Sequence, residues 1–316
     1  MKDLKTIRGM PDLYDEDVER ISIVENICLE TFKSFNFQEF RTPIVENKTL
    51  FQRSVGESSD IIQKEVYEFE DRNGEILCLR PEGTAGLVRA LITNGLMNDE
   101  IKKFFYLGPM FRYERPQKGR KRQFFQAGAE LIGEESTKSD VEIILLAKTI
   151  LEKLNVKYTL EINYLGKEDS LNSYRSYLRK YLQNFKDELS EKVYSRLQRN
   201  PIRAIDSKDS NIQEIFKKAR DISDFLKKEE KESFERTIKS LKDLKIDFNL
   251  NKNLVRGLDY YTGTVFEFTV DGLGAQNAVI GGGRYDNLIK DLGGRDLPAI
   301  GLSLIHISEP TRPSRI

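Results

Sequence analysis

Residues 256–263, with the sequence RGLDYYTG, combine an arginine, a carboxylate and two tyrosines with two glycines. A guanidinium presents a planar fork of donors that matches phosphate oxygens, and phenols donate and accept hydrogen bonds without carrying charge. Glycines allow the backbone to approach a ligand closely. The pattern is typical of a site for a small polar ligand beside a phosphate. For an isolated match, a glycine turn next to a half-buried aromatic strand is the simpler alternative.

A second segment, residues 79–84 with the sequence LRPEGT, ends an expected strand and opens an expected helix. Glu82 and Thr84 would then lie at the strand exit, where a carboxylate and a hydroxyl can hold an ammonium group. Thr84 could instead act only as the N-cap of the helix. That simpler role leaves the adjoining Arg80 and Glu82 unexplained, so both interpretations stay open.

Residues 111–124 form a strongly basic segment. Against a single acidic residue, Glu114, it contains six basic ones: Arg112, Arg115, Lys118, Arg120, Lys121 and Arg122. Clustered arginine and lysine fit a polyphosphate or nucleic-acid backbone, and Phe124 offers a ring on which a base can stack. A solvated basic hairpin is the common alternative, but it does not require an arginine at the end of an apolar strand. Arg112 is therefore the leading candidate for contact with a ligand.

The chain has 316 residues, with 51 basic and 51 acidic side chains and a formal net charge of zero. Domains commonly contain about 100 to 200 residues, so we expect two structural units, and phosphate contacts must come from local clusters of charge. Cys28 and Cys78 stand without a CxxC pair or a nearby histidine, which argues against zinc and against a disulfide framework. With neither a signal-like run nor a membrane-length apolar segment, a soluble cytoplasmic protein is expected.

Hydrophobic periodicity and turn signals predict the elements that position these residues. Helices are expected over residues 15–35, 84–94 and 139–154, and strands over 37–42, 66–70, 76–80, 103–113, 122–132 and 158–164. Asn73-Gly74 predicts a hairpin between the strands at 66–70 and 76–80. Pro43 stops the first strand and favours an edge or interface position.

Residues 166–250 are highly charged and helical in period, and strand-like sequence resumes at residue 251. Basic residues modestly outnumber acidic ones there, so a solvated helical face is the first interpretation and a weak contact with an RNA backbone the second. The expected fold is α+β. An antiparallel sheet flanked by helices is formed by residues 1–165 and 251–301, and residues 166–250 are a helical insertion.

In this combination and order, the motifs resemble the histidyl-tRNA synthetase family of class II aminoacyl-tRNA synthetases over residues 1–301. Residues 37–43 are similar to motif 1 of the class, with Pro43 at the dimer interface, and residues 111–114 with the basic hairpin are similar to motif 2. Residues 256–261 are similar to the histidine-specific signature, and residues 281–286 (GGGRYD) to the glycine-rich strand turn. The resemblance implies a cytoplasmic homodimer that uses L-histidine, ATP with Mg²⁺, and histidine tRNA.

The resemblance also implies an amino-acid pocket of six residues: Glu82, Thr84, Gln126, Glu130, Tyr260 and Tyr261. The first three would hold the α-ammonium group, while Glu130 and Tyr261 would read the two imidazole nitrogens. An apolar analogue would leave these polar groups unpaired, which predicts rejection by roughly ten-thousand-fold.

For ATP, the resemblance implies adenine contacts from Glu114 and Phe124. Arg112 and Arg256 would be catalytic residues on either side of the α-phosphate, and Arg120 would meet the distal phosphates with Mg²⁺. The histidine carboxylate would attack in line and pyrophosphate would leave, so charge neutralisation and orientation carry the reaction. No covalent enzyme intermediate is expected.

Two departures from the family pattern stand out. Phe125 occupies a position where the family more usually has histidine, so local hydrogen bonding is expected to differ there. Residues 302–312 read LSLIHISEPTR, which resembles a translated sequencing adapter. We expect residues 302–316 to be a non-native tail outside the fold, which would include His306, the only histidine. Motif 3 and the anticodon-binding domain would then be missing, and weak histidine activation is expected.

Two other interpretations remain. The chain could be a catalytically inactive, histidine-sensing paralogue, such as the regulatory subunit of ATP phosphoribosyltransferase. The enzyme is favoured by the presence of Glu82, Thr84, Arg112, Glu114 and Arg256, because a paralogue without ATP and tRNA chemistry has no need to keep adenine and phosphate contacts. The chain could also be a fragment that cannot fold, because loss of the last strand would expose an unpaired sheet edge.

Overall fold

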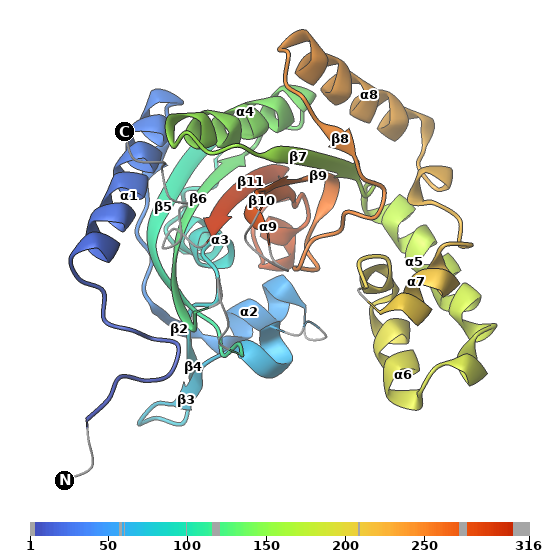
Figure 1. Cartoon of the computed structure of the whole chain (residues 1–316), viewed down its shortest axis with the longest axis horizontal. Helices are drawn as coiled ribbons and strands as arrows, with labels where there is room; N and C mark the ends of the chain where they lie inside the picture. The colour runs from blue at the N-terminus through green and yellow to red at the C-terminus, as the bar shows by residue number, and fades with distance from the viewer. Residues whose placement is uncertain are drawn as a thin grey trace.

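A computed structural model describes residues 4–56, 59, 61–98, 100–115, 121–207, 209–271 and 277–305. Its centre is an eight-stranded sheet (Figure 1). In spatial order the strands are β1 (Gln38–Glu39), β5 (Lys102–Phe111), β6 (Gln123–Ile132), β11 (Ala299–Ile305), β10 (Ala278–Arg284), β9 (Thr262–Thr269), β7 (Thr159–Tyr164) and β8 (Asn249–Leu250). The two edge pairs, β1–β5 and β7–β8, are parallel, and the other neighbours are antiparallel. The α+β fold expected from the sequence is confirmed.

A small three-stranded sheet of β2 (Val45–Asn47), β4 (Ile76–Leu79) and β3 (Glu68–Glu70) adjoins the large one. The predicted hairpin is present between β3 and β4, where Glu70 pairs with Ile76. Asp71 closes its turn by accepting hydrogen bonds from the backbone N–H groups of Asn73 and Glu75. Gly74 has a φ of 84°, a left-handed conformation that suits glycine at this position.

The helices occupy both faces of the large sheet. On one face lie α1 (Glu16–Ser34), α4 (Thr137–Lys153) and α8 (Lys228–Asp243), while α2 (Lys48–Val55), α3 (Thr84–Thr93) and α9 (Leu288–Asp291) lie on the other (Figure 1). Helices predicted over 15–35, 84–94 and 139–154 are confirmed as α1, α3 and α4 within three residues at each end. A π-helix, Ile61–Glu65, follows α2.

The period-two alternation of β6 separates the main core from the opposite face. Ala127, Ala129 and Leu131 point toward α1 and α4, where they join the main hydrophobic core. Phe124 and Ile132 point to the other face and join the cluster that includes α3. Gln126, Gly128 and Glu130 share their parity, so they lie on the face away from α4. Phe125 packs against the main core as an apolar side chain.

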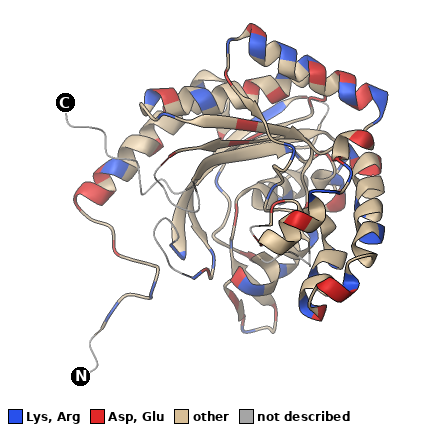
Figure 2. Ribbon diagram, turned by 45° about the vertical axis from the view of Figure 1, so that its right-hand side comes forward, with Lys and Arg blue, Asp and Glu red and all other residues tan. Residues whose placement is uncertain are grey.

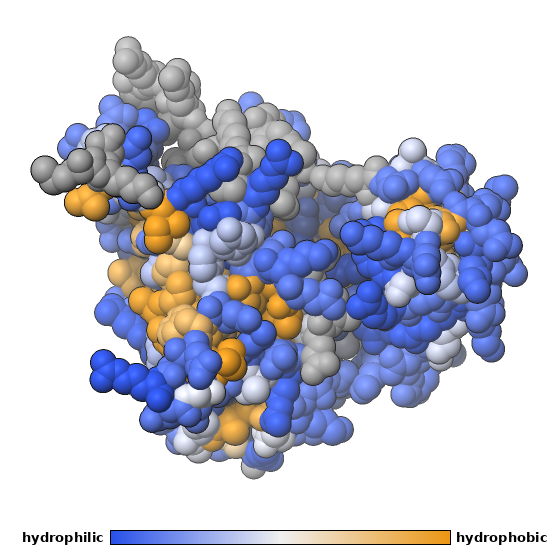
Figure 3. Space-filling model, turned by 90° about the horizontal axis from the view of Figure 1, so that it is seen from below, coloured by the Kyte–Doolittle hydropathy of each residue, from blue (hydrophilic) through white to orange (hydrophobic). Residues whose placement is uncertain are grey.

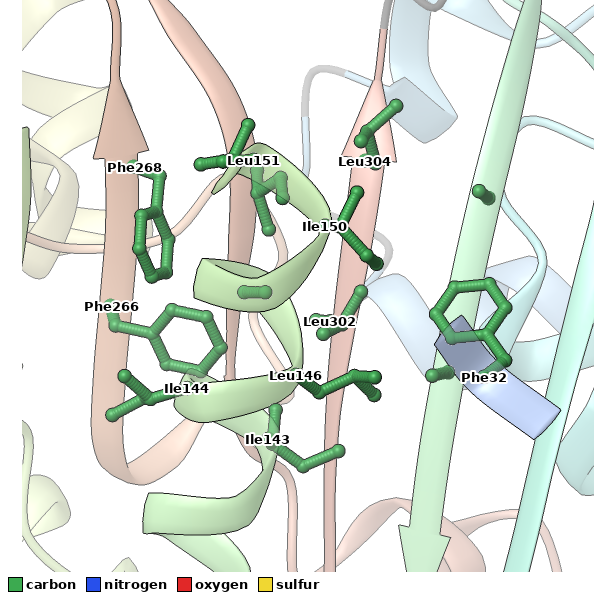
Figure 4. Close-up of a cluster of buried hydrophobic side chains, with 14 of the residues drawn as sticks. Phe32, Ile143, Ile144, Leu146, Ile150, Leu151, Phe266, Phe268, Leu302 and Leu304 are labelled. Atoms are coloured by element: carbon green, nitrogen blue, oxygen red, sulfur yellow. The ribbon is translucent and has the colours of Figure 1, made fainter. Parts of the chain in front are cut away.

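The main core itself is built by α4 lying across three strands (Figure 4). Ile143, Ile144, Leu146, Ile150 and Leu151 of α4 face Phe266 and Phe268 of β9 and Leu302 and Leu304 of β11, with Phe32 of α1 alongside. All ten side chains are at most 4% exposed. This layer holds the sheet rigid and leaves its opposite face to the functional residues.

The expectation that residues from 302 onward lie outside the fold is wrong for residues 302–305. They complete β11, which pairs with β6 on one side and with β10 on the other. Neither neighbour therefore has an unpaired edge along this strand, because β11 supplies backbone partners to both, and Leu302 and Leu304 fill the core under α4. Residues 306–316, including His306, lie outside the described residues, and the origin of the segment stays a prediction.

The predicted helical insertion contains α5 (Glu168–Gln183), α6 (Glu191–Arg199) and α7 (Ser210–Phe216), together with 3-10 helices at Lys186–Glu188, Pro201–Ala204 and Ile222–Asp224. These elements have a core of their own, made by Leu182, Leu197, Ala204 and Ile212. The last helix of the segment, α8, packs on α4, and its Leu241 belongs to the main core. Helices α5 to α7 thus form a subdomain to one side of the sheet (Figure 1).

Cys28 and Cys78 are free and buried. Within the described ranges there is no group of three or more His, Cys, Asp and Glu side chains able to hold a metal ion. None of the helices formed by the described residues combines the length and apolar character needed to cross a lipid bilayer.

Candidate active site

A cavity with an empty volume of about 400 Å³ lies on the sheet face opposite α4. It brings together the following predicted site residues: Glu82, Thr84, Arg112, Gln126, Glu130, Arg256, Tyr260 and Tyr261. They come from the start of α3, from β5 and β6, and from the segment that leads into β9. Residues up to 179 positions apart in sequence therefore meet in one hollow, which combines carboxylates, hydroxyls, an amide and two guanidinium groups.

Glu130 is the centre of a buried hydrogen-bond network. Its Oε1 accepts from the hydroxyl of Thr84 at 2.7 Å and of Tyr106 at 3.3 Å, and its Oε2 accepts from the hydroxyl of Tyr285 at 2.6 Å. The neighbouring strand, β11, must have a glycine at this position, because a Cβ atom on Gly301 would lie 1.7 Å from Glu130 Oε2. Burial raises the pKa of Glu130 to about 8, although the Tyr285 and Thr84 hydroxyls act in the opposite direction.

This pKa predicts a particular dependence of stability on pH. Because the folded chain binds the Glu130 proton more tightly than the unfolded chain, the resulting stabilisation is present at low pH and is lost as pH rises toward about 8. Glu130→Gln removes the ionisable carboxyl group. The free energy of unfolding of this variant should therefore decrease less steeply between pH 5 and 8 than that of the parent. The limiting slope is about 1.4 kcal/mol per pH unit. Urea unfolding at several pH values in this range measures the slope of the unfolding free energy against pH. Glu188→Gln, at an exposed position, is the control. Equal slopes in the parent and in Glu130→Gln would contradict the prediction.

Glu82 fixes the start of α3. Its two carboxylate oxygens accept hydrogen bonds from the backbone N–H groups of Thr84, at 2.7 Å, and Ala85, at 2.8 Å. Thr84 is the first residue of the helix and Gly83 occupies the N-cap position, so the interpretation of Thr84 as an N-cap is wrong. The capping role falls to Glu82, which leaves the Thr84 hydroxyl free to bond Glu130. Burial raises the pKa of Glu82.

Gln126 presents an oxygen to the interior of the site. Its Nε2 donates to the Ser303 hydroxyl of β11, and its Oε1 is buried without a hydrogen-bond partner among the described residues. A buried amide oxygen in that state is costly unless a donor reaches it. Gln126 is therefore poised to accept a hydrogen bond from a ligand in the cavity.

Arg256 is placed by its neighbours on β9 and β10. It forms an ion pair with Glu267, with the two side chains 14% and 21% exposed, and its Nε is buried with no partner among the described residues. Gly281 provides the space, because a Cβ atom there would lie 1.8 Å from the Arg256 guanidinium. The guanidinium also lies 6.0 Å from the Tyr261 ring. The charge of Arg256 thus stands at the cavity wall, partly neutralised by Glu267.

Arg112 also lines the cavity, directly after the end of β5. Its Nε donates to the Pro81 carbonyl at 2.9 Å, and its guanidinium lies 5.2 Å from the Phe124 ring. Glu114 is 4.0 Å away. Phe124 is buried beneath Arg112, and neither Phe124 nor Glu114 lines the cavity. Arg120 lies outside the described residues.

Two other predicted positions have different surroundings. Pro43 is exposed and lies beside the small sheet, away from the cavity lining. Arg122, expected as part of an electropositive loop, donates to the Glu114 carbonyl at 3.1 Å and stacks 3.8 Å over the Tyr113 ring. Its role is to close the base of the hairpin.

Sequence reasoning missed four residues that shape the site: Tyr106, Glu267, Gly281 and Tyr285. Gly281 and Tyr285 fall in the glycine-rich segment already singled out. Because side chains alternate between the two faces along a strand, counting every second residue of this segment would have placed Gly281 on the face of the sheet that carries the cavity. Tyr106 sits in an apolar strand, and Glu267 follows no motif. For these two the signal is only the parity of their strands.

The geometry agrees with the comparisons to known proteins. The family model described as histidyl-tRNA synthetase matches residues 9–306. A histidine--tRNA ligase of Hydrogenovibrio crunogenus is 45% identical over 304 residues, covering 96% of this chain and 71% of that protein. One from Prochlorococcus marinus is 47% identical over 306 residues, with 96% and 72% covered.

Solved structures give the same result. An apo S. aureus histidyl-tRNA synthetase superimposes with a TM-score of 0.78 at 34% identity, covering 96% of this chain and 72% of that one. An ATP phosphoribosyltransferase regulatory subunit/histidyl-tRNA synthetase from Bacillus halodurans has a TM-score of 0.69 at 21% identity, which shows a shared fold alone.

Proposed function

Because this chain belongs to the histidyl-tRNA synthetase family, we propose that the cavity activates L-histidine with ATP to give histidyl-adenylate, whose histidyl group is then transferred to a tRNA. The observation that carries the proposal is the cavity itself. It places a buried, hydroxyl-bonded carboxylate, Glu130, in the same hollow as two arginines, Arg112 and Arg256. An amino-acid side chain with two polar nitrogens fits the first feature, and a phosphate fits the second.

For the amino acid, we assign the imidazole to Glu130 and Tyr261 and the α-ammonium group to Glu82, Thr84 and Gln126. The unpartnered Oε1 of Gln126 supports an ammonium donor nearby. The ring of Tyr260 lies 4.7 Å from the tilted ring of Tyr261 and 5.6 Å, edge to face, from that of Tyr285, which supports a role for Tyr260 in shaping the pocket wall.

In the reaction, a carboxylate oxygen of histidine attacks the α-phosphorus, and the bond to the pyrophosphate oxygen breaks. Negative charge gathers on the α-phosphate oxygens, and Arg112 and Arg256 both line the cavity, where they can neutralise it. Both guanidinium groups are already oriented, by the Pro81 carbonyl and by Glu267 respectively. This preorganisation supports catalysis by orientation and charge without a covalent enzyme intermediate.

Glu114, Phe124 and Arg120 are assigned to the adenine and the distal phosphates. Mg²⁺ belongs to this proposal as an ion carried by the ATP phosphates. Such an ion commonly binds substrate phosphates and water with only one or two protein carboxylates. The ion would neutralise phosphate charge, while the protein supplies the arginines.

Binding of L-histidine to the purified chain, measured by calorimetry, is the first test. We expect saturable binding that Thr84→Val weakens, because the variant removes a hydroxyl bonded to Glu130, and rejection of phenylalanine. Histidine-dependent ATP–pyrophosphate exchange then separates the enzyme from a histidine-sensing regulatory subunit, which would bind histidine without exchange. Absence of any histidine binding would overturn the proposal.

Transfer to tRNA is supported by charge on the helical subdomain. In the ribbon of Figure 2, Lys and Arg positions (blue) alternate with Asp and Glu positions (red) on the helices of the subdomain. Exposed examples are Lys192, Arg196 and Arg199 on α6. Such a surface can meet an RNA backbone through local positive charge.

The two free cysteines suit the reducing cytoplasm that we propose as the compartment.

A homodimer is the proposed assembly. Four large apolar residues around Pro43 and the small sheet are 40–44% exposed: Ile44, Val45, Phe69 and Ile76. Figure 3, seen from below, shows hydrophobic side chains gathered on this side of the molecule. An exposed apolar patch of this kind is typical of a subunit interface.

Phe69→Asp should therefore weaken self-association by about tenfold or more, because it puts a charge into the buried part of the interface. Sedimentation velocity over a concentration series measures the change. Leu250→Asp is the matched control, since Leu250 is 58% exposed on β8 at the far edge of the large sheet. A parent chain that stays monomeric throughout the series would contradict the dimer.

A further inference from the structure

The segment that carries Arg256, Tyr260 and Tyr261 lies between the sheet domain and the helical subdomain. Leu258 points into the sheet domain, where it packs against the clusters that contain Leu50 of α2 and Leu87 of α3. Asp259, the next residue, does not line the cavity described above. The acidic member of this motif therefore has a role that the proposed reaction does not explain.

Asp259 is held by the helical subdomain. The amide of Asn200 donates to Asp259 Oδ1 at 2.8 Å, and the guanidinium of Arg203 is 3.5 Å from the same oxygen. Arg203 also donates to the Gly257 carbonyl. Asn200 precedes the 3-10 helix Pro201–Ala204, and Arg203 belongs to it. Two residues of the subdomain, Asn200 and Arg203, thus contact two positions of the functional segment, Asp259 and Gly257.

The other side of the Asp259 carboxylate is closed as well. A Cβ atom on Gly56, at the end of α2, would lie 2.8 Å from Asp259 Oδ2. The carboxylate is only 21% exposed, so it sits between a bare turn of the sheet domain and the two subdomain donors. Its position is defined from both sides.

Apolar contacts also join the segment to the subdomain, since Val255 and Tyr261 belong to one cluster with Leu171 of α5 and Ile202. A second cavity lies beside these contacts, and its lining includes Arg175, Asn200, Arg203, Arg256, Asp259 and Tyr261. Because Arg256 and Tyr261 line both cavities, movement of the segment into this second space would displace them from the first. The polar contacts to Asp259 and to the Gly257 carbonyl hold the segment beside this cavity.

We propose that Asn200 and Arg203 are positioning residues of the active site: by holding Asp259 and the Gly257 carbonyl, they fix the segment that places Arg256, Tyr260 and Tyr261. The consequence for ligands rests on the proposed function, whereas the contact itself does not. The helical subdomain is then part of the structure that sets the geometry of the amino-acid and phosphate pocket.

Exchanging the amide and the carboxylate between positions 200 and 259 tests the pair directly. Asn200→Asp places two carboxylates together and should reduce affinity for a nonhydrolysable histidyl-adenylate analogue by about tenfold or more, because small displacements of aligned groups are costly. Asp259→Asn should also reduce it. The combined variant Asn200→Asp/Asp259→Asn restores an amide–carboxylate pair with the partners reversed, and should recover most of the affinity. Lys218→Met, which removes an exposed charge just after α7, is the matched control and should have no effect.

Hydrogen–deuterium exchange provides a readout that requires no ligand. In Asn200→Ala and Arg203→Met, amides of residues 256–261 should exchange at least about tenfold faster, while β6 and β9 keep their protection. Unchanged exchange in this segment, or losses in the reversed pair that simply add, would overturn the positioning role. If the parent binds neither histidine nor the analogue but the exchange result holds, the proposed function fails and the positioning contact stands. Loss of protection throughout the sheet in both single variants would also overturn it, since the effect would then be global.

Discussion

Arg256→Met is expected to lower the rate of histidine-dependent ATP–pyrophosphate exchange by about a hundredfold to a thousandfold, the loss typical for one preorganised donor to developing charge. Methionine retains much of the side-chain volume but removes the guanidinium that stands at the cavity wall. The expected loss is in kcat more than in the KM for histidine, because the charge that Arg256 meets develops as the α-phosphate is attacked.

The control must separate lost catalysis from an unpaired buried carboxylate, since Arg256→Met leaves Glu267 without its partner. Arg256→Met/Glu267→Gln removes both charges and should restore stability without restoring exchange. Arg256→Lys keeps a positive charge without the planar fork, and we expect it to recover only part of the rate. Affinity for a nonhydrolysable histidyl-adenylate analogue supplies a measurement independent of turnover. Exchange by Arg256→Met within twofold of the parent would rule out the assigned role.

Arg284→Met is expected to destabilise the fold by about 3 to 5 kcal/mol, the usual consequence of leaving a buried charge without its partner. Arg284 lies 2.6 Å from Asp140, and the two side chains are 7% and 4% exposed. It also lies 3.4 Å from Asp286 and donates to Ser139 Oγ and the Ser136 carbonyl at the start of α4. One guanidinium therefore joins β10 to the helix that covers the sheet.

Urea unfolding at fixed pH measures the loss. Arg284→Met/Asp140→Asn is the matched control, because it removes the stranded carboxylate and should be less destabilised than Arg284→Met alone. Burial raises the pKa of Asp140 even in the presence of Arg284. Asp140 should therefore take up a proton in the single variant, which would partly relieve the loss at lower pH. A decrease below 1 kcal/mol in Arg284→Met would show that the pair contributes little.

Several parts of the fold could be predicted from local sequence because their causes are local. The β3–β4 turn follows from Asn73-Gly74 and the side chain of Asp71, all within five residues. Helix α1 follows from apolar residues at helical spacing, of which Ile21, Val24, Cys28 and Phe32 are buried. Period-two parity along β6 also predicts that Gln126 and Glu130 face the same way.

Other features depend on packing partners that the sequence does not reveal. Parity does not say which face of β6 the helices cover; that depends on where α4 docks. The network around Glu130 joins Thr84, Tyr106 and Tyr285 from three separate elements, and strand register decides that their hydroxyls meet. The helix-capping role of Glu82 also appears only in the structure, because Thr84 is the more usual capping residue type.

The sequence by itself determined the α+β class and the order of the motifs, because periodicity and residue chemistry are properties of short segments. The family resemblance of those motifs implied eight of the side chains that line the cavity. Only the tertiary structure decided that residues 302–305 complete the sheet, that Glu267 and Gly281 place Arg256, and that Asn200 and Arg203 hold Asp259. These contacts join positions distant in the chain. Their energies depend on the shape of the space between elements, which is defined only once the sheet, its helices and the subdomain have packed together.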